Sequence, residues 1–157
     1  MSNVKIIGIG SPYGNDSVGW RVIENLKQQH MLSTLLPERV ELIETDRPGI
    51  NLVQLWQGAE IVILIDAILD RPNHGEVRCL SKEELITAHH SVSTHELDVA
   101  SAIALAEKLN ILPEKLLIIG LGIDATQEEP VSEESIYKLT VAVTCEIKNY
   151  FAQATLN

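Results

Sequence analysis

The chain has 157 residues, of which 45% are apolar and only 4% aromatic. This length and composition suit one compact domain with an aliphatic core and exclude a disordered chain. The formal net charge is −10, and no basic cluster interrupts it, which argues against nucleic acid or anionic membranes as partners. The N-terminus lacks the charged and apolar regions of a signal peptide, and no apolar run reaches the ~20 residues of a membrane span. We therefore expect one domain over residues 1–157 in the cytoplasm, and we expect it to be a monomer.

Four short apolar runs predict strands that are buried on both faces: residues 4–9, 40–43, 61–65 and 116–121. Helical patterns lie between them. One follows the first strand with apolar residues at 18, 22, 23 and 26, and others lie near 50–56, 97–109 and 132–151. A further strand is expected at 75–80, after a turn. Alternating strands and helices indicate right-handed βαβ units. The sequence thus predicts an α/β fold: a single-domain, mainly parallel twisted sheet with helices on both faces, of phosphorylase/hydrolase-like type.

Two smaller features carry expectations of their own. Ser132 is the predicted N-cap of the last helix, and Glu133 and Glu134 place negative charge in its first turn. The two cysteines, Cys79 and Cys145, form no CxxC pair, and both have apolar neighbours. We expect both to be buried thiols, as free cysteines commonly are.

Three potential metal ligands follow the predicted strands or precede a predicted helix. Asp16 ends the loop after the first strand, Asp66 follows the apolar residues 61–65, and His95 precedes the helix at 97–109. Ligands of open α/β sheets sit outside the carboxyl ends of the strands, so these three side chains are expected to converge there. A carboxylate beside an apolar run is costly unless it is compensated, and a cation is one compensation. Two carboxylates and an imidazole suit Ni²⁺, Zn²⁺ or a similar divalent ion.

Each of these residues also has an ordinary structural explanation. Asp16 suits a helix N-cap, Asp66 a loop carboxylate bonded to backbone amides, and His95 a cap or surface position. Their expected convergence at one sheet edge favours the metal site.

The order of the motifs resembles the hydrogenase maturation proteases, endopeptidases that trim the large subunits of nickel–iron hydrogenases. The similar segments are GIGSPYGNDSVGWRVIENL, TDRPGINL, ILIDAI and STHELDV, which span nearly the whole chain in the same order. The resemblance implies that Asp16, Asp66 and His95 are the metal ligands. The chain departs from the family where it has Ser11, commonly Asn, and Asn15, commonly acidic.

The resemblance also implies an activity and a partner. The expected reaction is removal of a C-terminal extension from the precursor of the hydrogenase large subunit after nickel insertion, with the divalent metal, nickel, supplied by the substrate. The metal would polarise the scissile carbonyl or activate a water, or Asp16 or Asp66 would act as a general base. Tyr13 and Arg47 are expected contacts of the peptide.

Two alternatives stay open at this point. Gly8, Gly10 and Gly14 form a loose GxGxxxG that would suit a nucleotide-binding Rossmann-like module. Against it, a carboxylate at position 16 disfavours a pyrophosphate at the start of the following helix. A non-enzymatic metal-binding assembly factor would use the same three ligands, and only a cleavage assay separates it from a protease.

Overall fold

The structure is a computed structural model that describes residues 4–10, 17–29, 38–46, 48–87, 94–124, 126 and 129–154. The side chains of residues 85–87, 94–98 and 154 are outside this description. In chain order the elements are β1 (Val4–Gly10), α1 (Val18–Lys27), β2 (Val40–Asp46), η3 (Gly49–Asn51), α2 (Leu52–Trp56), β3 (Ile61–Leu69), η4 (Arg71–Asn73), β4 (Val77–Leu80), α3 (Lys82–Thr87), α4 (Thr94–Leu109), β5 (Lys115–Ile123) and α5 (Glu133–Ala154).

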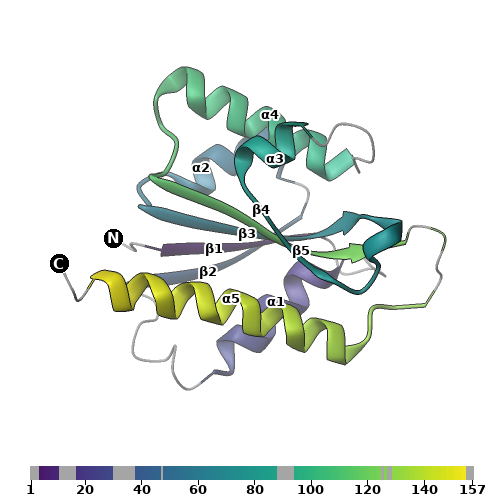
Figure 1. Cartoon of the computed structure of the whole chain (residues 1–157). Helices are drawn as coiled ribbons and strands as arrows, with labels where there is room; N and C mark the ends of the chain where they lie inside the picture. The colour runs from purple at the N-terminus through teal and green to yellow at the C-terminus, as the bar shows by residue number, and fades with distance from the viewer. Residues whose placement is uncertain are drawn as a thin grey trace.

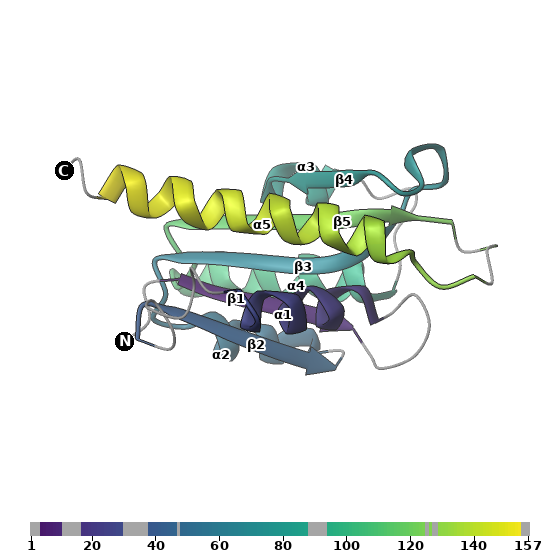
Figure 2. The same ribbon diagram turned by 90° about the horizontal axis from the view of Figure 1, so that it is seen from below.

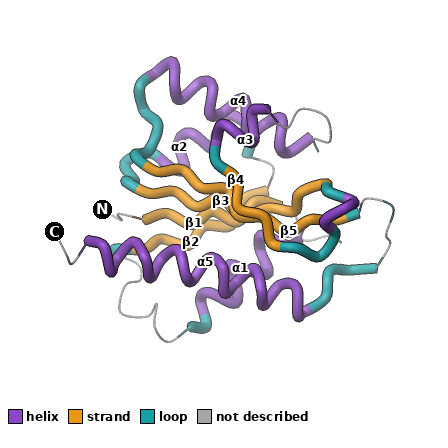
Figure 3. Tube along the Cα trace, in the orientation of Figure 1, coloured by secondary structure: helices purple, strands orange, loops and turns teal. Residues whose placement is uncertain are grey.

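The five strands form one sheet in the order β2-β1-β3-β5-β4 (Figure 1). All neighbouring pairs are parallel except β4 with β5, which is antiparallel. Helices α1 and α5 cover one face, and α2, α3 and α4 cover the other, as the trace in Figure 3 shows. The expected α/β fold with a mainly parallel sheet is therefore confirmed, including the additional strand at β4.

Alternation along the central strands divides the core in two. In β3, Ile63 and Ile65 pack toward α1 and α5, whereas Val62 and Leu64 pack toward α2 and α4. Successive side chains of a strand point to opposite faces, so a strand covered on both faces reads as a continuous apolar run. This burial explains why the strands were visible in the sequence.

Helix α1 approaches the sheet unusually closely, and two glycines make this possible. A Cβ on Gly19 would lie 2.5 Å from the carbonyl oxygen of Ile9 and 2.6 Å from that of Ile65. A Cβ on Gly8 would lie 2.5 Å from the carbonyl oxygen of Gly19. The first turn of α1 is therefore seated directly on β1 and β3, near their carboxyl ends.

Four expectations need correction. The second strand does not end at residue 43 but continues to Asp46. The third strand does not end at residue 65 but continues to Leu69, because its register with β5 is maintained through Leu69 and Ile123. Helix α3 was not predicted. Cys79 and Cys145 are both exposed rather than buried, because they lie on outward positions of β4 and α5. No helix in the described part of the chain is both long and apolar enough to cross a membrane.

Candidate active site

The strand order reverses direction between β1 and β3, at whose carboxyl ends a ligand site is expected. From β1 the chain passes through α1, on one face of the sheet, to the neighbouring strand β2. The next strand along the chain, β3, lies on the opposite side of β1. Figure 2 shows α1 crossing this region of the sheet. In open α/β sheets such a change of direction is where ligands bind.

Asp66 lies inside β3 and is the one buried charged residue among those that the structure describes, with 6% exposure. Its neighbours on the strand, Ile65 and Ala67, pack toward α1 and α5, so alternation places the Asp66 carboxylate on the α4 face. Oδ1 accepts a hydrogen bond of 2.8 Å from the backbone N–H of Ala67. Across the sheet, Asp66 is in register with Gly120, which has no side chain. The carboxylate is thus held by the strand itself at the carboxyl side of the core.

Helix α4 begins on the same side. It precedes β5 and runs antiparallel to the parallel strands, so its first turn lies toward their carboxyl ends (Figure 1). His95 is the second residue of this helix, and Val99, one turn later, packs in the cluster with Leu64 and Ile68 of β3. Asp66 and the start of α4 therefore share one face and one edge, although the His95 side chain lies outside the described part of the chain.

Asp16 also lies outside the described residues, together with Ser11, Tyr13, Asn15 and Arg47. The described residue next to it, Ser17, is the N-cap of α1. Because Gly19 rests on the carbonyl of Ile65, this end of α1 lies close to the residue that precedes Asp66. The backbone thus brings the neighbourhoods of Asp16, Asp66 and His95 to one sheet edge, while the ligand geometry itself stays a prediction. Among the described side chains, which include only Asp66 of the three, no group of three could hold a metal.

Polar contacts hold the segment that follows β3. The Asp70 carboxylate accepts hydrogen bonds from Asn73 Nδ2 at 3.0 and 2.9 Å and also pairs with Arg78. Asp124, at the end of β5, forms an ion pair of 3.4 Å with Arg71. Hydrogen bonds from the side chain and backbone of Thr126 lower the pKa of Asp124. These contacts stabilise the segments that follow β3 and β5 beside the candidate site, and we assign them no catalytic role.

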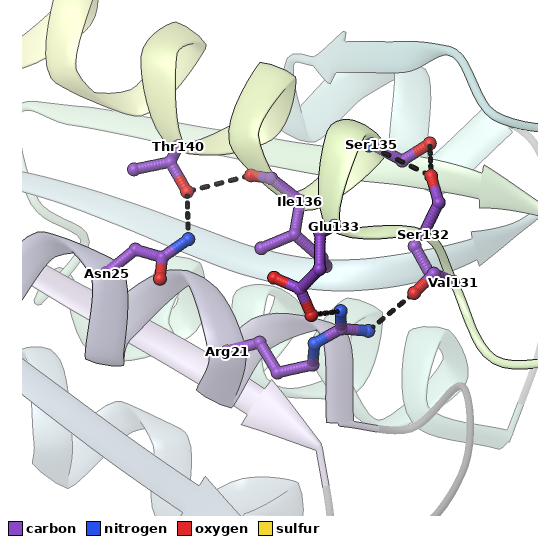
Figure 4. A network of polar contacts seen from close by, with 8 residues as sticks. All are labelled: Arg21, Asn25, Val131, Ser132, Glu133, Ser135, Ile136 and Thr140. Atoms are coloured by element: carbon purple, nitrogen blue, oxygen red, sulfur yellow. Dashed lines mark hydrogen bonds and ion pairs between the residues drawn. The ribbon is translucent and has the colours of Figure 1, made fainter.

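A second polar network joins α1 to the start of α5 (Figure 4). Arg21 donates to the Val131 carbonyl at 2.8 Å and pairs with Glu133, and Asn25 donates to Thr140 Oγ1 at 3.3 Å. The predicted N-cap of α5 is borne out, since Ser132 Oγ accepts the N–H of Ser135 at 3.2 Å. The contact of Arg21 with Val131 was not predicted from the sequence, because no local pattern indicates a contact between residues 110 positions apart.

Two hollows flank this region. One, of about 170 Å³, lies between the turn at His74 and Gly75 and the start of α5. The other, of about 450 Å³, follows the outer face of α1 from Ser17 to Asn25 and reaches Glu44 of β2. Neither includes Asp66, because both lie on the opposite face of the sheet.

Comparison with known proteins decides the family. Residues 20–154 match the family model described as hydrogenase maturation protease, a segment that includes Asp66 and His95 and begins just after Asp16. The chain belongs to the hydrogenase maturation protease family. It is accordingly a peptidase, and this membership favours the enzyme over the nucleotide-binding alternative.

Relatives in sequence and structure agree with this assignment. The chain is 24% identical over 121 residues to the hydrogenase 2 maturation protease of Escherichia coli K12, covering 75% of this chain and 71% of the relative. It is 27% identical over 150 residues to the hydrogenase expression/formation protein HoxM of Azotobacter vinelandii, covering 90% and 70%. The solved structure of the hydrogenase-maturating endopeptidase HybD from E. coli superposes with a TM-score of 0.80 at 22% identity, covering 96% of this chain and 94% of that one. At this identity the structural likeness supports the fold.

Proposed function

We propose that this peptidase removes a C-terminal extension from the precursor of a nickel–iron hydrogenase large subunit after nickel has been inserted. Family membership and the name of the E. coli relative support the substrate class. The observation that carries the proposal is the buried Asp66 carboxylate, placed on a central strand at the edge where ligands of such sheets bind.

Nickel belongs to the substrate in this proposal. Asp66, with Asp16 and His95 from the two helix starts at the same edge, would complete the coordination of the ion that the precursor carries. Burial of the Asp66 carboxylate fits this role, because a carboxylate taken out of water is stabilised by a nearby cation. A site with only three protein donors leaves coordination positions for substrate ligands.

The protease's own residues then have two tasks. They dock the metal-bearing part of the precursor so that the scissile peptide is held in a narrow approach geometry. Asp16 or Asp66 acts as the general base for the attacking water if it is not fully engaged as a ligand. Nickel, as a Lewis acid, would polarise the scissile carbonyl.

The direct test incubates the purified protease with nickel-loaded and nickel-free precursor and follows the C-terminus of the large subunit by mass spectrometry. Only the loaded precursor should be trimmed, since the nickel-free form lacks the docking interaction. Equal trimming of both forms would show that metal recognition is wrong. Failure to trim either form, with an E. coli enzyme and its own precursor as a positive control, would exclude the proposed substrate class.

Variants assign the residues. Asp66→Asn keeps the size and backbone contact of the side chain but removes its charge, and it should lower kcat/KM by about 100-fold or more, as loss of a metal or charge-stabilising group typically does. Asp16→Ala and His95→Ala should behave similarly. Asp70→Asn is the matched control, because that carboxylate is four residues away but is engaged by Asn73 and Arg78. If the first three variants cleave normally, the named residues are not the site.

A further inference from the structure

The outer edge of β2 carries backbone groups that the fold leaves unused. Among the described residues β2 pairs only with β1. The Val4 N–H donates to the Arg39 carbonyl at 3.0 Å, which fixes the phase of this parallel ladder. Alternate residues of a strand direct their N–H and C=O to opposite sides. Glu41 and Ile43 therefore bond to β1, whereas Leu42 and Glu44 direct both backbone groups outward.

Only the carboxyl half of this edge is open. Glu44 taken as a whole residue is exposed, whereas its side chain alone is only 27% exposed. Its main-chain atoms therefore contribute to the accessible surface. Toward the amino end, Val40 is completely buried, and Arg39 lies over the ring of Phe151 at 4.5 Å. An added strand would therefore pair with Leu42 and Glu44 and end before Val40.

The open edge is protected against pairing by acidic side chains alone. Natural edge strands are commonly blocked by lysine, proline or a bulge, but β2 reads VELIETD and pairs with β1 without interruption. Its charged residues are all acidic. Glu41 pairs with Lys5 at 3.9 Å. The carboxylate at position 44, on the opposite face of the strand, would repel a second copy of the same strand and attract a basic one.

The 450 Å³ hollow on α1 adjoins the same stretch and is also rich in carboxylate. Glu24, Glu44 and Glu133 line it together with Arg21, which pairs with Glu133. Lys27 lies 3.1 Å from Glu24 and 3.7 Å from Glu44. Desolvation and the hydrogen bond with Glu24 raise the pKa of Glu44, while that shared hydrogen bond lowers the pKa of Glu24. Among the described residues, these three carboxylates and two cations leave one surplus negative charge, which a further cation would neutralise.

We infer that the open edge of β2 binds a short basic segment of the precursor's C-terminal extension as an added antiparallel strand, with a lysine or arginine side chain beside Glu24 and Glu44. This inference rests on the proposed function. The extension begins at the scissile bond, at the carboxyl edge of the sheet, so it must run from Asp46 toward Val40. Strand addition of this kind takes its affinity from main-chain bonds and its specificity from side-chain contacts.

The geometry limits which residues of the extension are read. A strand added outside β2 would lie three strand spacings from β3, a separation of about 14 Å, which about four extended residues span. The first four or so residues after the cleavage site therefore pass β1 and β2, and about four further residues pair with the open edge. Basic residues are expected in this second group.

Peptides test the edge without altering the protein. The probe is a fluorescent ten-residue peptide of alternating lysine and valine. One control carries N-methyl groups on alternate residues, and another has glutamate in place of lysine. The lysine peptide should bind, and N-methylation should weaken it about tenfold, the factor expected for losing one or two backbone hydrogen bonds. The glutamate peptide should not bind. Equal binding of the N-methylated peptide would overturn strand addition, and binding of the glutamate peptide would overturn charge recognition.

Amide hydrogen exchange by NMR locates the contact. With the lysine peptide, exchange at Leu42 and Glu44 should slow about tenfold or more, whereas Glu41 and Ile43, already bonded to β1, should change little. Protection at Leu42 and Glu44 in the free protein, together with a dimeric mass, would mean that a second copy occupies the edge. Protection elsewhere would equally refute the assignment.

Variants connect the edge to cleavage. Glu44→Gln removes the charge, and Glu44→Pro also removes an outward N–H without breaking a bond to β1. Both should raise KM for nickel-loaded precursor with kcat retained, and the proline variant should do so more strongly. Glu134→Gln, an exposed carboxylate on α5, is the charge-matched control and should leave KM unchanged. Unchanged KM in Glu44→Pro would refute the edge proposal and leave the proposed function intact. Absence of cleavage by the unmodified protein would refute the proposed function and, with it, the precursor as the source of the bound strand, even if the lysine peptide still binds the edge.

Discussion

Cys79 lies exposed on β4, but its surroundings make its thiol a weak nucleophile. Partial desolvation and the negative charges of Glu146 and Glu84 raise the pKa of this thiol. Because the thiolate is the reactive form, alkylation should be slower than for a free thiol at the same pH. In a Cys145→Ser protein, iodoacetamide at pH 8 should modify Cys79 more slowly than glutathione, as measured by peptide mass spectrometry. A rate equal to that of glutathione would show that the surroundings have no such effect.

Single residues were the least predictable level of the structure. Apolar neighbours suggested that both cysteines were buried, but orientation on a strand or helix, which depends on tertiary packing, places them outward. Asp66 was predicted to follow its strand because a charge interrupts the apolar run. The strand instead continues through Asp66, since pairing with β5 stabilises Ala67 to Leu69 regardless of one polar residue. The sequence singles out Asp66 as a candidate ligand, but its position inside a strand could not be predicted.

At the level of elements, the seating of α1 on the sheet depends on Gly19. In a solvent-exposed helix, replacing glycine by alanine stabilises by about 1 kcal/mol. Here the new methyl group would meet two carbonyl oxygens at 2.5 and 2.6 Å, so Gly19→Ala should destabilise by about 1–3 kcal/mol, the usual range for overpacking. Thermal unfolding should show a lower Tm. Ser101→Ala, at an exposed position of α4, is the control and should change Tm little. A stabilised Gly19→Ala protein would contradict the close packing.

Long amphipathic or apolar elements were predictable, and short ones with local caps were not. The apolar face of α1, with Val22, Ile23 and Leu26, follows directly from its spacing and is fully buried. Helix α3 was missed although its signal is present. Ser81 Oγ accepts the N–H of Glu84 at 3.2 Å and donates to its carboxylate, which matches the S-x-x-E sequence of a capping box and the first of its two bonds. Its six residues were too few for periodicity to reveal them.

For the whole molecule, strand order determines where the candidate functional residues lie. The sequence predicted alternating strands and helices, and parallel crossovers then placed the strand ends at one edge. The insertion of β4 at the far side of β5 could not be derived, because pairing between distant segments depends on the complete core. The common edge for Asp66 and the start of α4 followed from topology alone, whereas the edge of β2 became visible only from the register.

The composition of the proposed metal site predicts a distinct dependence on pH. Protons compete with a metal for each ligand, and an imidazole has a reference pKa of about 6.5, whereas carboxyl groups lie near 4. A site with one histidine should therefore lose Ni²⁺ affinity as pH falls from about 7 to about 5. A site of carboxylates alone should hold its affinity until the pH approaches 4 to 5. Calorimetric titration with Ni²⁺ at several pH values measures this difference. His95→Ala should bind more weakly at pH 7.5 and should lose the dependence between pH 7 and 5. An unmodified protein whose affinity is constant over that interval would remove His95 from the ligand set and leave Asp16 and Asp66 to be tested alone.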